Sequence, residues 1–123
     1  MVEQTTLKNQ AHVYRLSGDY NPLHIDPALA KKVGFDAPIL HGLCSLGHAT
    51  RHVLAQYGGS DPRRFRAVKL RFASPVLPGE TLVTEMWRES DTKIIFQTKV
   101  KERNVVVINN AYVLLNAGGS AKL

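Results

Sequence analysis

The chain has 123 residues, the length of one domain and enough to bury a single hydrophobic core. Its 44% hydrophobic and 21% charged residues are typical of a globular protein, and no apolar run approaches the roughly 20 residues of a membrane span. The net charge of +6 suits an anionic partner, but the longest run of lysine or arginine is two residues, so we predict no nucleic-acid binding. The single cysteine, Cys44, excludes an internal disulfide and is typical of a reducing compartment.

The first 40 residues predict short elements separated by turns. Residues 2–6 could supply a short first strand, and a short helix from about Leu7 leads into a turn. Asp26 and Pro27 are typical of an N-cap and a first helical position, so a second short helix is expected there, ending at Gly34. The next residues, up to Leu40, predict an irregular loop whose apolar side chains either line a pocket or cap the core.

The longest predicted helix covers residues 42–57, where apolar residues recur at spacings of three and four. Gly47 and Ala49 would allow a neighbouring sheet to approach closely, and Gly58 ends the helix. Cys44 is expected to be a buried packing residue. His48 and His52 are four residues apart, a spacing that can bind metal, but without a carboxylate in the pattern we predict polar helix surface and no metal site.

Four strands are predicted after this helix, over residues 65–73, 81–89, 93–102 and 105–115. The last run is almost continuously apolar, which predicts a strand that is covered on both faces. One long helix followed by an antiparallel meander is an α+β arrangement.

Residues 14–26 concentrate the polar chemistry of the chain. Asp19, Asn21 and His24 lie within six residues that Gly18 and Pro22 shape into a turn. A carboxylate and an imidazole so placed suit general acid–base catalysis, although Asp and Asn also make ordinary turn bonds. Asp26 already has a structural task as the N-cap and is left out of the candidate set.

This stretch matches the pattern Tyr/Phe-x-x-Ser-Gly-Asp-x-Asn-Pro-Leu-His-x-Asp of the MaoC-like hotdog family, and every fixed position is present. The likeness continues through residues 38–43 and 68–76 and covers about residues 7–115. It is greatest to the hydratase 2 units of peroxisomal multifunctional enzymes. The resemblance implies a single hotdog domain over residues 1–117, in which an antiparallel sheet wraps a central helix, and a flexible tail over residues 118–123.

The same resemblance implies an (R)-specific 2-enoyl-CoA hydratase that adds water reversibly to trans-2-enoyl-CoA in fatty-acid β-oxidation. Asp19 and His24 would hold the water and move its protons, Asn21 would orient the water or Asp19, and the Gly42 N–H would bind the thioester oxygen. The predicted substrate contacts are Pro38, Ile39, His41 and Leu43. Lys69 and Arg71 are candidate contacts of the coenzyme A phosphates, with a solvated surface charge as the alternative for each. No cofactor is expected, because coenzyme A is part of the substrate.

Two other functions remain open on these residues. One is dehydration of 3-hydroxyacyl groups on acyl carrier protein, which uses the same chemistry in reverse. The other is a non-catalytic acyl-CoA-binding hotdog module, against which the presence of Asp19, His24 and Gly42 argues.

The final residues, Ala121, Lys122 and Leu123, differ from the Ser-Lys-Leu peroxisomal address by one small residue. Together with the resemblance, they predict a peroxisomal protein that an import receptor recognises. A lone hotdog leaves a sheet edge unpaired, so a homodimer or higher oligomer is also expected.

Overall fold

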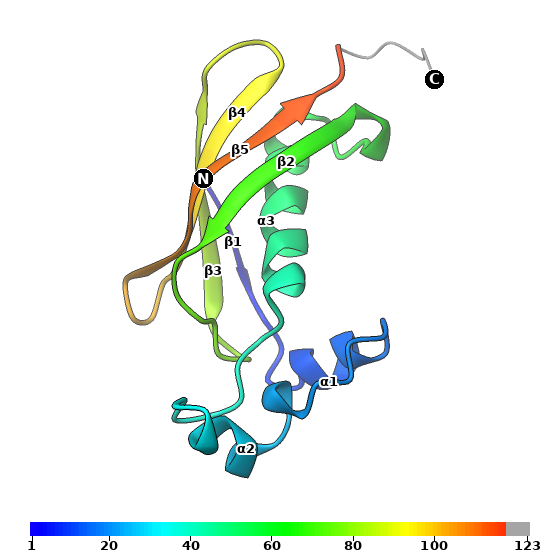
Figure 1. Cartoon of the computed structure of the whole chain (residues 1–123). Coiled ribbons are helices and arrows are strands. Elements are labelled where there is room, and N and C mark those ends of the chain that lie inside the picture. The colour runs from blue at the N-terminus through cyan, green and yellow to red at the C-terminus, as the bar shows by residue number, and fades with distance from the viewer. Residues whose placement is uncertain (118–123) are drawn as a thin grey trace.

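Helix α3 (Gly42–Tyr57) lies along one face of a five-stranded antiparallel sheet in the computed structural model, which describes residues 1–117 (Figure 1). The strands follow the spatial order β1-β3-β4-β5-β2, so that β1 and β2 form the two edges of the sheet. Their bounds are β1 Val2–Thr5, β2 Phe65–Phe72, β3 Thr81–Arg88, β4 Lys93–Val100 and β5 Val105–Leu115. This confirms the predicted α+β hotdog fold, with a first strand as short as the sequence indicated.

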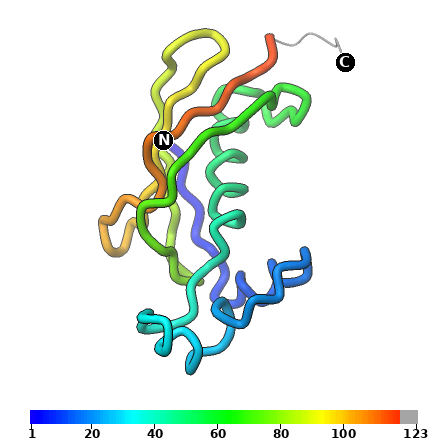
Figure 2. The backbone as a smooth tube through the Cα atoms, viewed as in Figure 1, coloured from blue at the N-terminus to red at the C-terminus, as the bar shows by residue number. Residues whose placement is uncertain are grey.

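Between β1 and α3 the chain forms a small lobe beyond the N-terminal end of α3, as the backbone tube shows (Figure 2). The lobe contains α1 (Gln10–Arg15), the 3₁₀ turn η1 (Pro22–His24) and α2 (Pro27–Lys32). The Asp26 carboxylate accepts a hydrogen bond from Ala28 N at 3.0 Å, which confirms its predicted role as the N-cap of α2. A second 3₁₀ turn, η2 (Pro62–Arg64), joins α3 to β2.

The hydrophobic core lies between α3 and the sheet. In β4, alternation directs Ile94, Phe96 and Val100 towards the helix, where all three are fully buried. Ala49 and Val53 meet them from α3, and neither is exposed to solvent. Gly47 does not serve the close approach that the sequence suggested, since a Cβ at this position would meet nothing within 4 Å.

Strand β5 differs in part from the prediction: Val107 and Ile108 are both buried, but from residue 109 to residue 115 only Ala111, Val113 and Leu115 are. The register of β5 against β4 shifts between Ile108 and Ala111, and Asn110 there has a φ of 48°. Residues an odd number of positions apart normally face opposite sides of a strand, but this bulge lets Ile108 and Val113 both lie in the core although they are five positions apart. Asn110 at the bulge is exposed and Tyr112 is only partly buried, so this part of the strand is not covered on both faces.

His52 is also placed differently from the prediction. Instead of lying on the polar helix surface, its ring is buried and its Nδ1 lies 2.8 Å from Thr84 Oγ1, which contacts Thr98 Oγ1 at 3.1 Å. This hydrogen-bonded chain links α3 to β3 and β4. His48 instead donates from Nδ1 to the carbonyl oxygen of Cys44 at 2.9 Å, one turn earlier in the helix.

Cys44 is buried in the core, as the sequence predicted, and burial raises the pKa of its thiol to about 11. Within residues 1–117, no helix is long and apolar enough to cross a membrane.

Candidate active site

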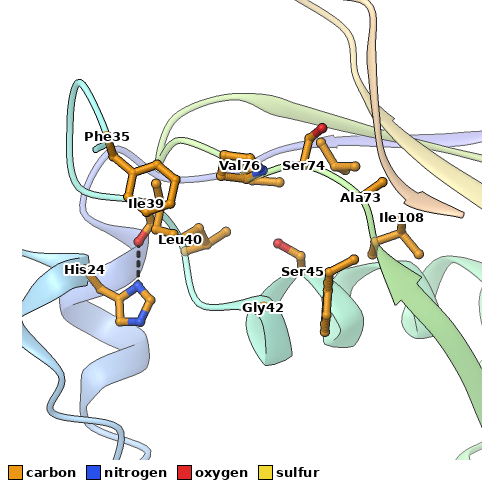
Figure 3. Close-up of a pocket in the computed structure, with 13 residues that line it drawn as sticks. His24, Phe35, Ile39, Leu40, Gly42, Ser45, Ala73, Ser74, Val76 and Ile108 are labelled. Atoms are coloured by element: carbon orange, nitrogen blue, oxygen red, sulfur yellow. Dashed lines mark hydrogen bonds between the residues drawn. The ribbon is translucent and has the colours of Figure 1, made fainter. Parts of the chain in front are cut away.

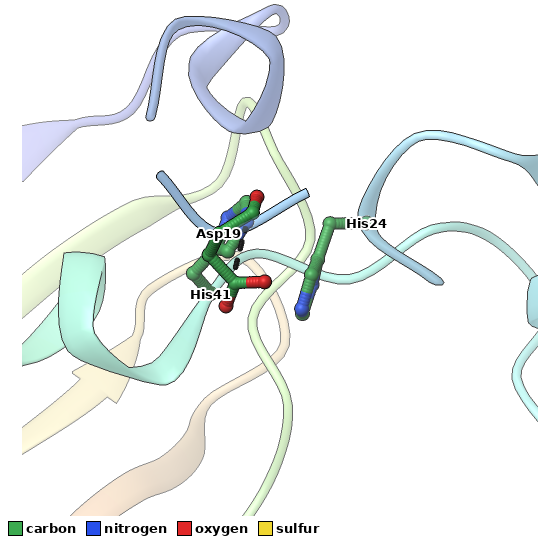
Figure 4. Close-up of side chains that lie close together, drawn as sticks. All are labelled: Asp19, His24 and His41. Atoms are coloured by element: carbon green, nitrogen blue, oxygen red, sulfur yellow. Dashed lines mark hydrogen bonds and ion pairs between the residues drawn. The ribbon is translucent and has the colours of Figure 1, made fainter. Parts of the chain in front are cut away.

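Three polar side chains converge where the lobe meets the N-terminus of α3. A carboxylate oxygen of Asp19 and one ring nitrogen each of His24 and His41 all lie within 4.8 Å of one another (Figure 4). Two groups that each bond a shared water at about 2.8 Å can be separated by roughly this distance, so the spacing suits one water molecule between them.

His24 is fixed in orientation by its backbone surroundings. Its Nδ1 lies 2.7 Å from the carbonyl oxygen of Ile39. A carbonyl can only accept, so Nδ1 carries the hydrogen and Nε2 of the neutral ring keeps a free lone pair. The half-buried ring is therefore ready to accept a proton at Nε2.

Asp19 is held by the turn in which it lies. Its Oδ1 accepts a hydrogen bond from the backbone N–H of Asn21 at 3.1 Å, and its side chain is 52% exposed. Gly18 directly before it has a φ of 119°, a conformation that favours glycine and that lets the chain turn back towards α3. The turn therefore presents the Asp19 carboxylate to His24 without burying it.

The side chain of Asn21 has a local role, one of the two alternatives that the sequence left open. Its Oδ1 accepts from the backbone N–H of Leu23 at 3.0 Å and caps η1. Asn21 thus contributes its backbone N–H to Asp19 and its side-chain carbonyl to the turn that carries His24.

His41 lies beneath both catalytic candidates and is 2% exposed. Its ring stacks on that of His24, with centroids 3.8 Å apart and planes inclined by 26°. Its Nε2 donates to the backbone oxygen of Asp19 at 3.3 Å and lies 4.0 Å from Asp19 Oδ2. Burial lowers the pKa of His41 below its usual 6.5, nearby His24 lowers it further, and Asp19 opposes both effects.

An apolar cavity of about 320 Å³ opens beside this cluster (Figure 3). Its walls come from the lobe, the first turn of α3, the end of β2, the loop after it and β5. The lining residues are His24, Phe35, Ile39, Leu40, Gly42, Ser45, Phe72, Ala73, Ser74, Pro75, Val76, Val107 and Ile108.

The backbone N–H of Gly42 is free to bind a ligand in this cavity. As the first residue of α3 it has no acceptor within the helix, and it donates no hydrogen bond elsewhere within residues 1–117. The positive end of the helix dipole adds to the attraction of this N–H for developing negative charge.

The structure places only some of the expected substrate contacts at the cavity. Ile39 lines the cavity and His41 lies behind it, whereas Pro38 and Leu43 are absent from the lining and Leu43 is 63% exposed. Lys69 and Arg71 are exposed on β2, with Lys69 Nζ 5.9 Å from the centroid of the Tyr112 ring on the outer face of the sheet.

Sequence reasoning missed several lining residues, of which Phe72 and Ser45 are the most informative. Phe72 lies in the strand predicted over residues 65–73, and its ring covers Gly42. Ser45 directs its hydroxyl into the cavity one turn after Gly42 (Figure 3). The three-residue spacing from Gly42 to Ser45 was a usable signal, because residues three apart share a helix face.

The distances among Asp19, His24 and His41 would also admit a metal ion. The hydrogen-bond roles oppose this, because Nε2 of His41 must carry a hydrogen to donate to the Asp19 carbonyl. A metal ligand needs a free lone pair at the nitrogen that faces the ion. The absence of a metal site stays a prediction.

Comparison with known proteins gives a consistent result. The family described as "MaoC like domain" matches residues 1–111. Peroxisomal multifunctional enzyme type 2 of Mus musculus is 58% identical over 120 residues, which cover 97% of this chain and 16% of that protein. The peroxisomal enoyl-CoA hydratase 2 of Arabidopsis thaliana is 53% identical over 106 residues, covering 86% of this chain and 34% of that protein.

Among solved structures, the MaoC-like dehydratase from Phytophthora capsici superposes with a TM-score of 0.91 at 51% identity. The superposition covers 94% of this chain and 40% of that one. The chain therefore spans less than half the length of each of these three relatives.

Proposed function

Because the chain belongs to the MaoC-like family, we propose that it is an (R)-specific 2-enoyl-CoA hydratase of fatty-acid β-oxidation, acting also in the reverse direction as a 3-hydroxyacyl-CoA dehydratase. The observation that carries this proposal is the convergence of Asp19 and His24 beside the free Gly42 N–H at an apolar cavity. This gives the site groups that move protons, a donor for an oxyanion and room for an acyl chain. The names of the mouse and Arabidopsis relatives support the same activity.

The proposed reaction adds water across the C2–C3 double bond. Asp19 and His24 Nε2 hold the water, whose oxygen bonds to C3 while one of its protons passes to the pair. A proton from the pair goes to C2, so the π bond is replaced by a C–O and a C–H bond. General acid–base groups of this kind are typically worth about 10²–10⁴-fold in rate.

As the water attacks, negative charge builds on the thioester oxygen. The Gly42 N–H, at the first turn of α3, is the proposed donor to that oxygen. The loss of one such donor costs roughly 2.7–4 kcal/mol of transition-state stabilisation in other enzymes. These steps use no cofactor, in keeping with a substrate that carries its own coenzyme A.

The acyl chain is proposed to occupy the cavity between Phe35, Ile39 and Phe72. Its volume of about 320 Å³ is near the lower end for small-molecule sites, which favours short or medium acyl chains. Lys69 and Arg71 remain proposed contacts of the coenzyme A phosphates. Arg71 directly precedes Phe72, so a pantetheine chain that leaves the cavity across the edge of β2 would carry phosphates past these cations.

We also propose that the protein acts as a homodimer or higher oligomer. Within residues 1–117, strand β2 pairs only with β5, so this edge of the sheet is free for a second chain. Beside it, the face of α3 that points away from the sheet carries a hollow lined in part by Leu46, Thr50 and Leu54. Thr50 Oγ1 is buried there without a hydrogen-bond partner among residues 1–117.

Peroxisomal location is proposed because both named relatives, from mouse and Arabidopsis, are peroxisomal. The tripeptide 121–123, with its import receptor, stays a prediction that lies outside the described residues, as does the flexible tail.

The activity can be tested with crotonyl-CoA, whose enoyl-thioester absorbance disappears on hydration. We expect loss of this band with the protein and formation of the (R)-3-hydroxy product. Activity only on the acyl-carrier-protein thioester would favour the dehydratase alternative. Binding without turnover of either thioester would favour the non-catalytic module.

A further inference from the structure

His41 is an unusual residue for the start of a helix. It is the N-cap of α3, a position where serine, threonine, aspartate or asparagine usually bonds the first free N–H groups. The side chain of His41 makes no such bond, and its Nδ1 is buried without a partner among residues 1–117. Both features cost stability, so a requirement other than folding is indicated.

The His41 ring instead contacts Asp19 and His24, the two proposed catalytic residues. The rings of Tyr14 and His24 both pack against it, at centroid distances of 4.7 and 3.8 Å. At its edge, Nε2 contacts both the backbone oxygen and the carboxylate of Asp19. One buried ring thus touches both groups that are proposed to hold the water.

Asp19 needs such support, because its side chain is half exposed on a turn. Within residues 1–117, its carboxylate has hydrogen-bond or ion-pair distances only to Asn21 N and His41 Nε2. The first contact lies within the turn itself. His41 is the group that ties the turn to α3, whose first residue offers the proposed oxyanion donor.

We propose that His41 is a positioning residue, which sets Asp19 and His24 at the separation the water requires through its Nε2–H bond and its stacked ring. This inference rests on the proposed hydratase function. It differs from the substrate contact that the sequence suggested, since the polar contacts of the His41 ring are with Asp19 and its stacking contact is with His24.

Two variants separate the two contacts of the ring. His41→Phe keeps a flat ring against Tyr14 and His24 but removes the N–H, whereas His41→Gln returns an N–H and removes the ring. His52→Gln is the matched control, because His52 is equally buried on α3 but bonds Thr84 away from the cavity. The measurements are kcat and KM for crotonyl-CoA, with the melting temperature of each variant.

We expect His41→Phe to lower kcat by about 10- to 100-fold, the range that misplacement of a catalytic group can cause, while KM changes little. His41→Gln should retain more of kcat than His41→Phe. His52→Gln should lower the melting temperature and leave kcat normal at temperatures well below it. A normal kcat in His41→Phe, a rise in KM alone, or an equal kcat loss in His52→Gln would overturn the proposal.

A spectroscopic measurement tests the positioning role of His41 independently of turnover. Failure of the wild-type protein to hydrate crotonyl-CoA would contradict the proposed function, but it would not affect this measurement. In nitrogen-15 NMR spectra, His41→Phe should shift the Asn21 amide, which bonds Asp19, and the His24 ring nitrogens. His52→Gln should leave these signals in place. Unchanged Asn21 and His24 signals in His41→Phe would show that His41 positions neither group.

Discussion

The Phe72 ring lies so close above Gly42 that a Cβ atom added at residue 42 would meet its Cζ at 3.1 Å. One glycine therefore serves two needs at the start of α3. It leaves room for an aromatic wall of the cavity, and it keeps its own N–H open to a thioester oxygen in that cavity.

We expect Gly42→Ala to lower kcat by about 10-fold or more, because the displaced ring disturbs both the cavity wall and the approach to the N–H. Stability should change little, since alanine is the better helix former by up to about 1 kcal/mol. The double variant Gly42→Ala/Phe72→Leu removes the ring and should lose less activity than the sum of the two single changes. If the activity losses of the two single variants simply add in the double variant, the contact between residue 42 and the Phe72 ring is not the cause of the loss.

Asp19→Asn and His24→Gln should each lower kcat by at least about a hundredfold, the general acid–base range, in folded protein. Asp26→Asn is the matched control, because Asp26 lies in the same segment but caps α2, and asparagine caps equally well. Steady-state hydration of crotonyl-CoA and circular dichroism measure the two effects. Near-normal turnover in either Asp19→Asn or His24→Gln would place the proton chemistry elsewhere.

Acid should destabilise the fold through His52. Burial, and then the charges of Arg51 and His48, lower its pKa from 6.5 to about 4 in the folded chain. Above pH 6.5 the residue is neutral in both states, whereas between pH 6.5 and 4 the unfolded chain binds a proton that the folded chain does not. The free energy of unfolding should therefore fall over this range, by at most about 3 kcal/mol from this residue.

Urea unfolding at several pH values tests the role of His52. His52→Gln should show a weaker dependence on pH than the wild type, although not a flat one. His41, whose pKa is also lowered, contributes in the same direction. An unaltered pH dependence in His52→Gln would assign the acid sensitivity to other groups.

The oligomer can be measured by light scattering coupled to size exclusion. We expect twice 13.6 kDa or a multiple of it, because residues 1–117 of one chain cover neither the edge of β2 nor the hollow on α3. A charged substitution in that hollow, Leu46→Glu, should shift the protein towards the monomer. A hydratase-active species at the monomer mass would contradict the dimer.

The terminal tripeptide can be tested apart from the enzyme. A green fluorescent protein that ends in residues 119–123 should collect in peroxisomes if Ala-Lys-Leu is read as an address. The same fusion with Lys122→Glu should remain diffuse. Diffuse fluorescence of the unaltered fusion in cells with working import would remove the tail as an address and leave the proposed hydratase activity untouched.

Much of this fold follows from local signals in the sequence. Helix α3 begins and ends at the predicted residues, Gly42 and Tyr57, because apolar periodicity and a terminal glycine define both its face and its end. The Asp26 cap and the turn containing Asp19 and His24 were equally predictable, since their hydrogen bonds connect residues close together in the sequence.

What the sequence could not provide depends on long-range packing. Phe72 lies thirty positions after Gly42, and nothing local to either residue brings the two together. The buried place of His52 required a hydroxyl on β3, and the exposed side of β5 required a bulge that reverses strand parity.

The burial of Cys44 gives this chain an internal reporter of local opening. Its thiol lies two residues after the proposed oxyanion donor, and at neutral pH a pKa of about 11 leaves almost none of it as the reactive thiolate. Alkylating reagents will therefore modify it mainly in molecules whose first turn of α3 has moved away from the sheet. The labelling rate of this one natural cysteine would then measure how often the catalytic end of the helix opens, without any introduced probe.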